Sequence, residues 1–311
     1  MRILALSALC LSAAACDTPS VPHAADAAAT DAPSSDAPAR DVGPSPDAAL
    51  DRCGFDGDPA GLTDLATTAI WRSDYAFAEI FDMPGLVLTD FRSNAHVFVR
   101  SDAVVLRRFL LDPSATTGGY YTIRTDGRDP GAGLLVESGT ITATSVSDDG
   151  PLKGVLVDVP GMTLRDLDIS GSHDGISVAA GNLLVEHTCI HDLGTSPTAH
   201  NDGIEIYGGA RVVIRDVVID NPHDQTSAIN ITNDYGPIDD VVIEHAHLAG
   251  GGYTIYVRGD GASGGAVTNL HFRDVVIDRP GSFGVLSYEA APGAIVEWDV
   301  RDAQGRAIPM P

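Results

Sequence analysis

The sequence predicts an all-β protein, a parallel β-helix solenoid whose coils hold about 29 residues. The first observation is a recurring pattern of one apolar residue, two mostly polar residues, two variable residues and another apolar residue. Its copies begin at Leu106, Val136, Leu164, Val185, Ile214, Ile243 and Phe272, in steps of 30, 28, 21, 29, 29 and 29 residues. Repeats this short cannot each bury a core, so we expect them to stack on one another.

The second observation is a strand pattern that runs in phase with the first. It consists of a small residue, an apolar residue, a variable residue and usually another apolar residue, which is the alternation of a β-strand. The copies are Gly175-Ile176-Ser177-Val178, Gly203-Ile204-Glu205-Ile206, Ala228-Ile229-Asn230-Ile231, Thr254-Ile255-Tyr256-Val257 and Gly284-Val285-Leu286. Each coil therefore holds at least two short strands, and Ile176, Ile204, Ile229 and Ile255 should lie over one another. A β-sandwich is the alternative, but it does not require a constant step.

The two patterns resemble those of the right-handed parallel β-helix (pectate-lyase-like) superfamily, over roughly residues 80 to 300. This resemblance implies a right-handed solenoid. Members of the superfamily commonly bind and cut polysaccharides on a flat outward face, so the resemblance also implies a polysaccharide as partner.

The N-terminus reads as an export signal. Met1-Arg2 precedes an apolar run that ends at Ala15, which is too short for a permanent membrane span. The end of this run, Ser12-Ala13-Ala14-Ala15-Cys16, resembles a bacterial lipobox, although Ala13 stands where leucine is usual. The resemblance implies a signal in residues 1–16, a lipid anchor on Cys16 and an exported protein of the cell envelope or cell surface. An ordinary signal peptide cut near Ala15 is the alternative.

Three further segments follow the signal. Residues 17–52 are mostly Ala, Asp, Pro and Ser, and such a composition predicts a disordered tether. Residues 53–82 hold no clear copy of either pattern but contain an aromatic-rich stretch, so we expect an N-terminal cap. Residues 83–311 form the predicted solenoid, and Trp298 is a candidate for closing its far end.

Two of the four cysteines remain for the folded body, Cys53 and Cys189, because Cys10 lies in the signal and Cys16 is the lipidation candidate. Export permits a disulfide between them. Two free, buried thiols are an equal alternative.

The formal net charge is −24, and the sequence has no basic stripe, so nucleic acid is excluded as a partner. A polyanionic glycan would also be repelled unless divalent cations bridge it. The chain has a single lysine, Lys153.

Candidate site residues follow from aligning the second-pattern strands, which places outward side chains in columns about 4.8 Å apart. The columns are Ser177, Glu205, Asn230, Tyr256 and Leu286; Ala179, Tyr207, Thr232 and Arg258; and Asp174, Asp202, Ser227 and Tyr253. We predict His200, Asp202 and Glu205 as catalytic residues, since carboxylates and an imidazole support acid–base chemistry on glycans. The predicted substrate-binding residues are Asp174, Asn230, Tyr253, Tyr256 and Arg258.

Structural interpretations of the same residues stay open. Asp-Gly is a favoured turn pair, and the segment 200–204 repeats 172–176, so the motif is also consistent with a corner of the coil. The metal is unknown, but Asp174, Asp202 and Glu205 could hold Ca²⁺. A separate set at equivalent positions of the first pattern is expected to consist of turn residues that bond neighbouring coils: Asp166, His187, Asp216, His245 and Asp274.

The sequence thus predicts a surface-tethered carbohydrate-active protein that binds a polysaccharide on the outward face of the β-helix. Whether it also cleaves or modifies that polysaccharide, as a polysaccharide lyase or a glycoside hydrolase, is left open. The alternative is a non-catalytic glycan-binding or adhesive envelope lipoprotein, because the full catalytic phrases of polygalacturonases and mannuronan C5-epimerases are missing. A purely structural envelope protein is a third possibility.

Overall fold

The computed structural model describes residues 53–65, 77–113, 121–125, 133–143, 153–196 and 199–310. All of them belong to one compact unit, Pro44–Pro311. The predicted signal, its lipidation candidate Cys16 and the tether 17–52 lie outside the described residues. Within the described ranges no helix is long and apolar enough to span a membrane.

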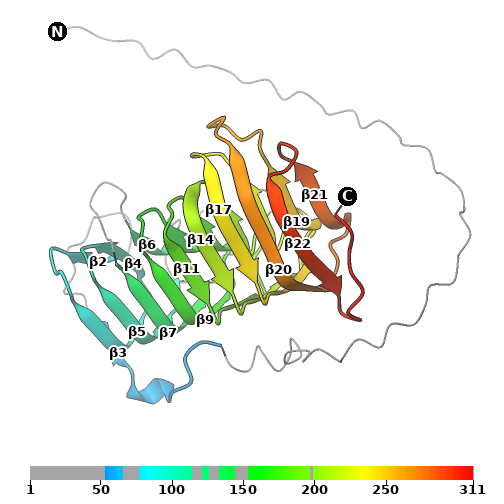
Figure 1. Ribbon diagram of the computed structural model, residues 1–311. Helices are drawn as coiled ribbons and strands as arrows, with labels where there is room; N and C mark the ends of the chain where they lie inside the picture. Colours follow the sequence, from blue (N-terminus) through cyan, green and yellow to red (C-terminus); the bar gives the residue numbers. More distant parts are fainter. Residues whose placement is uncertain are drawn as a thin grey trace, which may run out of the picture. The chain divides into compact units, whose positions relative to one another are not determined.

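The regular secondary structure of the described chain is almost entirely β-strand, arranged in two parallel sheets (Figure 1). The nine-stranded sheet has the order β2 (Phe77–Phe81), β4 (His96–Arg100), β6 (Tyr121–Thr125), β8 (Lys153–Val157), β10 (Asp174–Val178), β13 (Ile204–Ile206), β16 (Ile229–Thr232), β19 (Tyr253–Arg258) and β21 (Gly284–Glu289). Each strand pairs with the equivalent strand of the next coil. The fold is a parallel β-solenoid with roughly 28 residues per coil, which confirms the predicted fold class.

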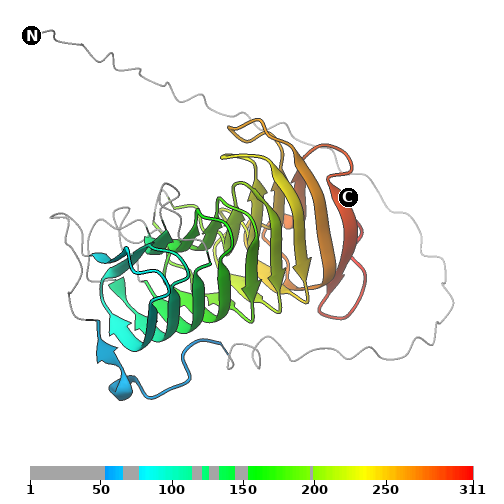
Figure 2. The same ribbon diagram turned by 60° about the vertical axis from the view of Figure 1, so that its left-hand side comes forward.

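The thirteen-stranded sheet forms the other sides of the coils. It begins with β1 (Thr63–Asp64), β3 (Val87–Ser93), β5 (Val105–Leu111), β7 (Leu135–Thr142), β9 (Thr163–Ser170), β11 (Leu183–Glu186), β14 (Gly209–Arg215), β17 (Ile238–Glu244) and β20 (Val267–Arg279). From β20 the strand pairing continues to β18 (His247–Gly250), β15 (Val218–Asn221) and β12 (Cys189–His191). The strand β22 (Ile295–Asp302) also pairs with β20. The single short 3-10 helix of the described residues is η1 (Pro59–Gly61). Figure 2 shows the successive coils side by side.

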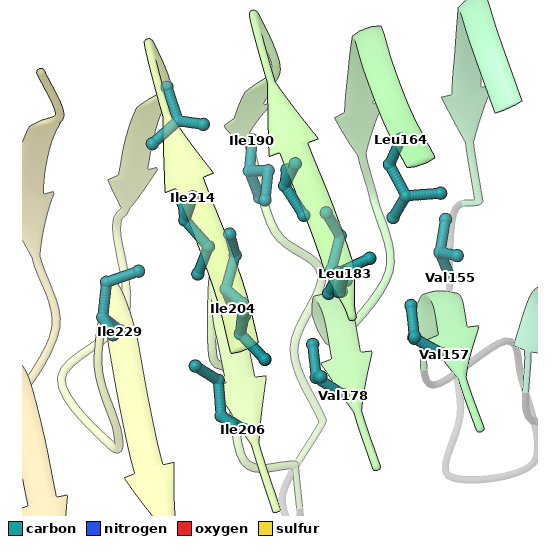
Figure 3. Packing of buried hydrophobic residues seen from close by; sticks show 14 of the residues in the cluster. Val155, Val157, Leu164, Val178, Leu183, Ile190, Ile204, Ile206, Ile214 and Ile229 are labelled. Carbon is teal, nitrogen blue, oxygen red and sulfur yellow. The ribbon is translucent and has the colours of Figure 1, made fainter. Parts of the chain in front are cut away.

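The core is a set of vertical columns of apolar side chains. Ile204 lies opposite Ile176 on one side and Ile229 on the other, and Ile229 lies opposite Ile255. All four are fully buried, as the predicted stack requires. Figure 3 shows such columns between the two sheets.

The last rung differs from the expected alignment. Leu286 pairs with Ile255, and Ser287 takes the place beside Tyr256 that the sequence alignment gave to Leu286. Val285 and Leu286 are consecutive apolar residues, so the two-residue period does not say which of them faces inward. Both are only partly buried at this end of the solenoid.

Every first-pattern copy contains a residue with left-handed backbone, which bends the coil at the same point. These residues are Arg108, Ser138, Asp166, His187, Asp216, His245 and Asp274, with φ between 47° and 54°, and Asp90 in β3 has the same conformation with φ 56°. Short polar side chains tolerate this region better than β-branched ones do. His187 lies 3.5 Å from Asp166 and 3.7 Å from Asp216, so the predicted turn residues do contact one another between coils.

The outer surface of the thirteen-stranded sheet carries a ladder of alternating charge. One register column contains Arg107, Glu137, Arg165, Glu186, Arg215, Glu244 and Arg273. Arg165 Nε donates to Glu137 at 2.7 Å, and Arg215 Nε donates to Glu186 at 3.0 Å. Opposite charges in directly facing positions favour this register, since a slip would remove the pairs.

The N-terminal end of the described chain runs along the solenoid. Cys53 forms a disulfide with Cys189 of β12, with 5.8 Å between the Cα atoms. Phe55 N–H donates to Thr140 Oγ1 at 3.1 Å, and β1 then pairs with β3. Parallel pairing therefore begins at β1 and β2, inside the range 53–82 expected to be a cap; residues 66–76 lie outside the described part.

The C-terminal end is covered by the chain folding back on β22. Trp298 Nε1 donates to the carbonyl oxygen of Ile308 at 2.8 Å, and Ile308 N–H donates to Val300 at 2.9 Å. The Trp298 ring also packs against Phe272 with 5.1 Å between centroids. Trp298 thus contributes to closing this end, as expected.

Candidate functional site

Three adjacent strands of the nine-stranded sheet bring a polar cluster together. Lys153 and Asp174 open β8 and β10 and face each other in register. Glu205 lies between the inward-facing Ile204 and Ile206 in β13, so its side chain points to the outer surface of the sheet. We call Lys153, Asp174, Asp202, Glu205 and Tyr207 the carboxylate–lysine cluster.

The ammonium of Lys153 is the centre of this cluster. Its Nζ donates to Asp174 Oδ2 at 2.5 Å, to Glu205 Oε2 at 3.0 Å and to the Tyr207 hydroxyl oxygen at 2.7 Å. The Tyr207 hydroxyl in turn donates to Glu205 Oε2. All three carboxylates of the cluster are buried.

Asp202 holds neighbouring coils together. Its Oδ1 accepts from the Ser227 N–H at 2.9 Å and from the Ser227 hydroxyl at 2.7 Å, and its Oδ2 accepts from Asn230 Nδ2 at 3.2 Å. The Asp202 N–H donates to Asp174 Oδ1 at 2.9 Å. Both carboxylate oxygens of Asp202 therefore accept hydrogen bonds from fixed donors. The contacts of Asp202 connect three consecutive coils.

Burial and mutual repulsion perturb the cluster's acid–base properties. Burial raises the pKa of Asp202 well above its usual range, and the charges of Glu205 and Asp174 raise it further. Burial also raises the pKa of Asp174 and brings the pKa of Glu205 to about 7, although Lys153 opposes both shifts. Burial lowers the pKa of Lys153, but the charges of Asp174 and Glu205 outweigh it and the net shift is upward. The titrations of the three carboxyl groups are therefore coupled, and each group is harder to ionise than an isolated carboxyl group in water.

The predicted site residues are brought together only in part. Asp174, Asp202 and Glu205 each offer an oxygen within 4.8 Å of the others, an arrangement close enough for a metal ion. Here the ammonium of Lys153 already supplies positive charge to two of these carboxylates.

His200 does not join this arrangement. It is exposed, and within the described chain it forms no hydrogen bond or ion pair with the three carboxylates. Residues 199–203 are not in a strand, so the two-residue alternation that would place His200 beside Asp202 does not hold there.

A second feature of this region is a set of contacts between aromatic side chains of strands and turns. Tyr253 packs edge-on against Tyr256 at 5.2 Å and against Phe283 at 5.9 Å, and Tyr235 packs against Tyr207 at 4.8 Å. Tyr235 is 70% exposed and Phe283 is 66% exposed. We call Tyr253, Tyr256 and Phe283 the aromatic surface; Tyr207 and Tyr235 form a separate aromatic pair.

The remaining predicted binding residues lie in the same region. Asn230 faces Tyr256 in register, and Thr232 faces Arg258. Arg258 is exposed, and its guanidinium lies 3.2 Å from Asp260 and 3.8 Å from Glu289, which balance its charge.

Sequence reasoning placed Tyr207 in an outward column without assigning it to the site, and it missed Lys153 of the cluster, Phe283 of the aromatic surface and Tyr235, which packs against Tyr207. A signal for Lys153 existed, because it is the chain's sole lysine and precedes Gly154-Val155-Leu156-Val157, a copy of the second pattern. Tyr235 and Phe283 lie in turns between strands, where no periodicity predicts which side chains share a surface.

Comparison with known proteins gives no relative from which a function could be transferred. No protein family, no curated protein and no solved structure matches this chain.

Proposed function

We propose that this protein binds an extended, neutral polysaccharide along the outward face of the nine-stranded sheet. The observation that carries the proposal is the aromatic surface, in which Phe283 stays largely exposed and packs against Tyr253, which in turn packs against Tyr256. Exposed apolar patches with polar groups at their rim are typical of binding sites. Tyrosine and phenylalanine rings offer flat apolar faces to the C–H faces of sugars, and Tyr hydroxyls and Asn230 offer hydrogen bonds.

Charge favours a neutral glycan over a polyanionic one. The chain carries a formal net charge of −24, and Arg258 is already paired with Asp260 and Glu289. A polyuronate would meet repulsion unless Ca²⁺ bridged the two surfaces.

Binding is supported better than catalysis. Glycoside hydrolysis needs two carboxyl groups that reach the scissile bond from opposite sides. Asp202 and Glu205 are buried, and their oxygens accept hydrogen bonds from Ser227, Asn230, Tyr207 and Lys153. We therefore propose the non-catalytic glycan-binding function first, and cleavage or modification of the glycan second. Membership of the pectate-lyase-like superfamily and attachment to the cell envelope through Cys16 belong to the same proposal.

Binding to a panel of neutral glycans and polyuronates, with and without Ca²⁺, tests this function. Tyr253→Ala and Phe283→Ala should each weaken binding of the recognised glycan about tenfold, equivalent to ~1.4 kcal/mol. Phe81→Ala is the matched control, since Phe81 is 49% exposed but lies on β2, many coils away.

Two results would count against the proposal. Absence of saturable binding to every glycan would remove it, and so would equal losses in the control and the two test variants. New chain ends or unsaturated products during incubation would instead support the enzymatic alternative.

A further inference from the structure

Lys153 has an unusual place in this chain. It is the sole lysine, whereas every other Lys/Arg position is an arginine. Only the lysine amine can act as a nucleophile after losing a proton, while a guanidinium stays charged. An arginine would serve an ion pair at least as well, so the lysine at this one buried position calls for a chemical explanation.

The amine and the carboxyl group of Asp174 are held for reaction. The two residues face each other in adjacent parallel strands, and Nζ lies 2.5 Å from Asp174 Oδ2. Their side chains are 15% and 5% exposed, so water is largely excluded from both groups. Fixing two reactants in contact replaces a bimolecular encounter by an intramolecular step.

The neighbouring groups supply the rest of an acyl-transfer site. Asp174 Oδ1 accepts the Asp202 N–H at 2.9 Å, which is a donor placed to stabilise negative charge on that oxygen. Glu205 Oε2 lies 3.0 Å from Lys153 Nζ, so its carboxyl can take a proton from the nitrogen. The hydroxyl of Tyr207 donates to Glu205 and keeps it in this position.

We propose that Lys153 and Asp174 form an intramolecular isopeptide bond, with Glu205 as the proton carrier. Glu205 first carries one proton from the Lys153 ammonium to Oδ2 of Asp174, which leaves a neutral amine facing a neutral carboxylic acid. The amine lone pair then attacks Cγ of Asp174, and the N–C bond forms while Oδ1 takes up the negative charge. Glu205 takes a second proton from the nitrogen and gives it to Oδ2, the carbonyl at Oδ1 re-forms, and the bond from Cγ to Oδ2 breaks as Oδ2 leaves as water. The net change is the loss of one water molecule from an ammonium and a carboxylate, and Glu205 is regenerated.

Such a bond would lock one coil to the next. Lys153 and Asp174 are separated by 21 positions and belong to β8 and β10. The disulfide joins different residues, Cys53 and Cys189, so the two cross-links are independent. A covalent link inside a solenoid resists local opening of the strands that it connects, a useful property in an adhesive surface protein.

The sole lysine makes the test direct. The purified full-length protein is reduced, unfolded and treated with an amine-reactive reagent, then digested with trypsin. The proposal predicts that Lys153 stays unlabelled and uncleaved. Residues 129–165 and 166–211 should appear as one joined peptide, lighter by one water molecule than the sum of the two. Fragment masses should place the link on Asp174. A labelled or cleaved Lys153, or a link on Glu205, would overturn the assignment.

Variants separate chemistry from folding. Lys153→Arg keeps the positive charge but has no amine, so trypsin should cleave after position 153 and release residues 166–211 as a free peptide. Glu205→Gln should leave residues 129–165, with Lys153 labelled, separate from residues 166–211 if Glu205 carries the proton; joining at the wild-type extent would refute that role. Glu137→Gln is the matched control, because Glu137 is another buried, ion-paired glutamate but lies on the thirteen-stranded sheet. It should retain the joined peptide.

Discussion

Ile204 and Ile229 are neighbours in adjacent coils although they are distant in the sequence. We therefore predict a measurable energetic coupling between them. Both are fully buried and lie opposite each other in β13 and β16. Truncation of either to alanine removes three carbon atoms, worth about 0.8 kcal/mol each in transfer free energy. With the cavity left behind, each single variant should lose about 3 kcal/mol of unfolding free energy.

The double variant should lose less than the sum. Each isoleucine packs against the other, so the second truncation removes contacts that the first has already lost. We expect a coupling of about 1 kcal/mol. The assay is urea unfolding followed by far-ultraviolet circular dichroism, with the unfolding free energies compared in a double-mutant cycle.

A second pair of buried residues, which do not contact each other, is the control for this double-mutant cycle. Leu106 is equally buried but belongs to β5 of the other sheet, several coils away. Ile204→Ala and Leu106→Ala should add within ~0.5 kcal/mol. Strict additivity for Ile204 and Ile229 as well would refute the argument that they share one column.

Two further predictions concern pH and the disulfide. The hydrogen bond with Asp168 raises the pKa of His191 to about 9 against the effect of burial, and Asp192 adds to the rise. The resulting stabilisation, about 2 kcal/mol after allowance for solvent, is complete below about pH 6.5 and lost as pH rises through about 9. The difference in unfolding midpoint between wild type and His191→Gln should vanish by pH 10; a constant difference argues against it. Reduction of Cys53–Cys189, which closes a separation of 136 residues, should lower stability by up to about 5 kcal/mol, and an unchanged midpoint would contradict this.

The sequence allowed the register of the solenoid to be predicted because the repeat carries two independent signals. Each coil has an inward isoleucine in one strand and a residue with left-handed backbone, such as Asp166 or Asp216, in another. A slip of the register would displace both features at once. At Val285 and Leu286 only the apolar pattern is available, and the sequence alignment of this strand with its neighbour was wrong by one residue.

The composition of the site was less predictable for a physical reason. Alignment identifies which residues share a column, and it correctly brought Asp174 near Asp202 and Glu205. It does not say how far a long side chain reaches along the sheet, and Lys153 extends from β8 to Glu205 in β13. Burial of the carboxylates also depends on the surrounding side chains, which strand periodicity does not describe.

Cross-linking between engineered cysteines tests the central claim, the parallel register of the site-bearing strands, most directly. Asn230 and Tyr256 face each other in β16 and β19, so their Cα atoms should lie about 5 Å apart, within reach of a disulfide. The pair Asn230→Cys and Tyr256→Cys should therefore oxidise readily. The pair Asn230→Cys and Arg258→Cys, displaced by two residues along the strand to roughly 8 Å, should not. The opposite preference, or equal cross-linking of both pairs, would contradict the register on which the carboxylate–lysine cluster and the aromatic surface depend.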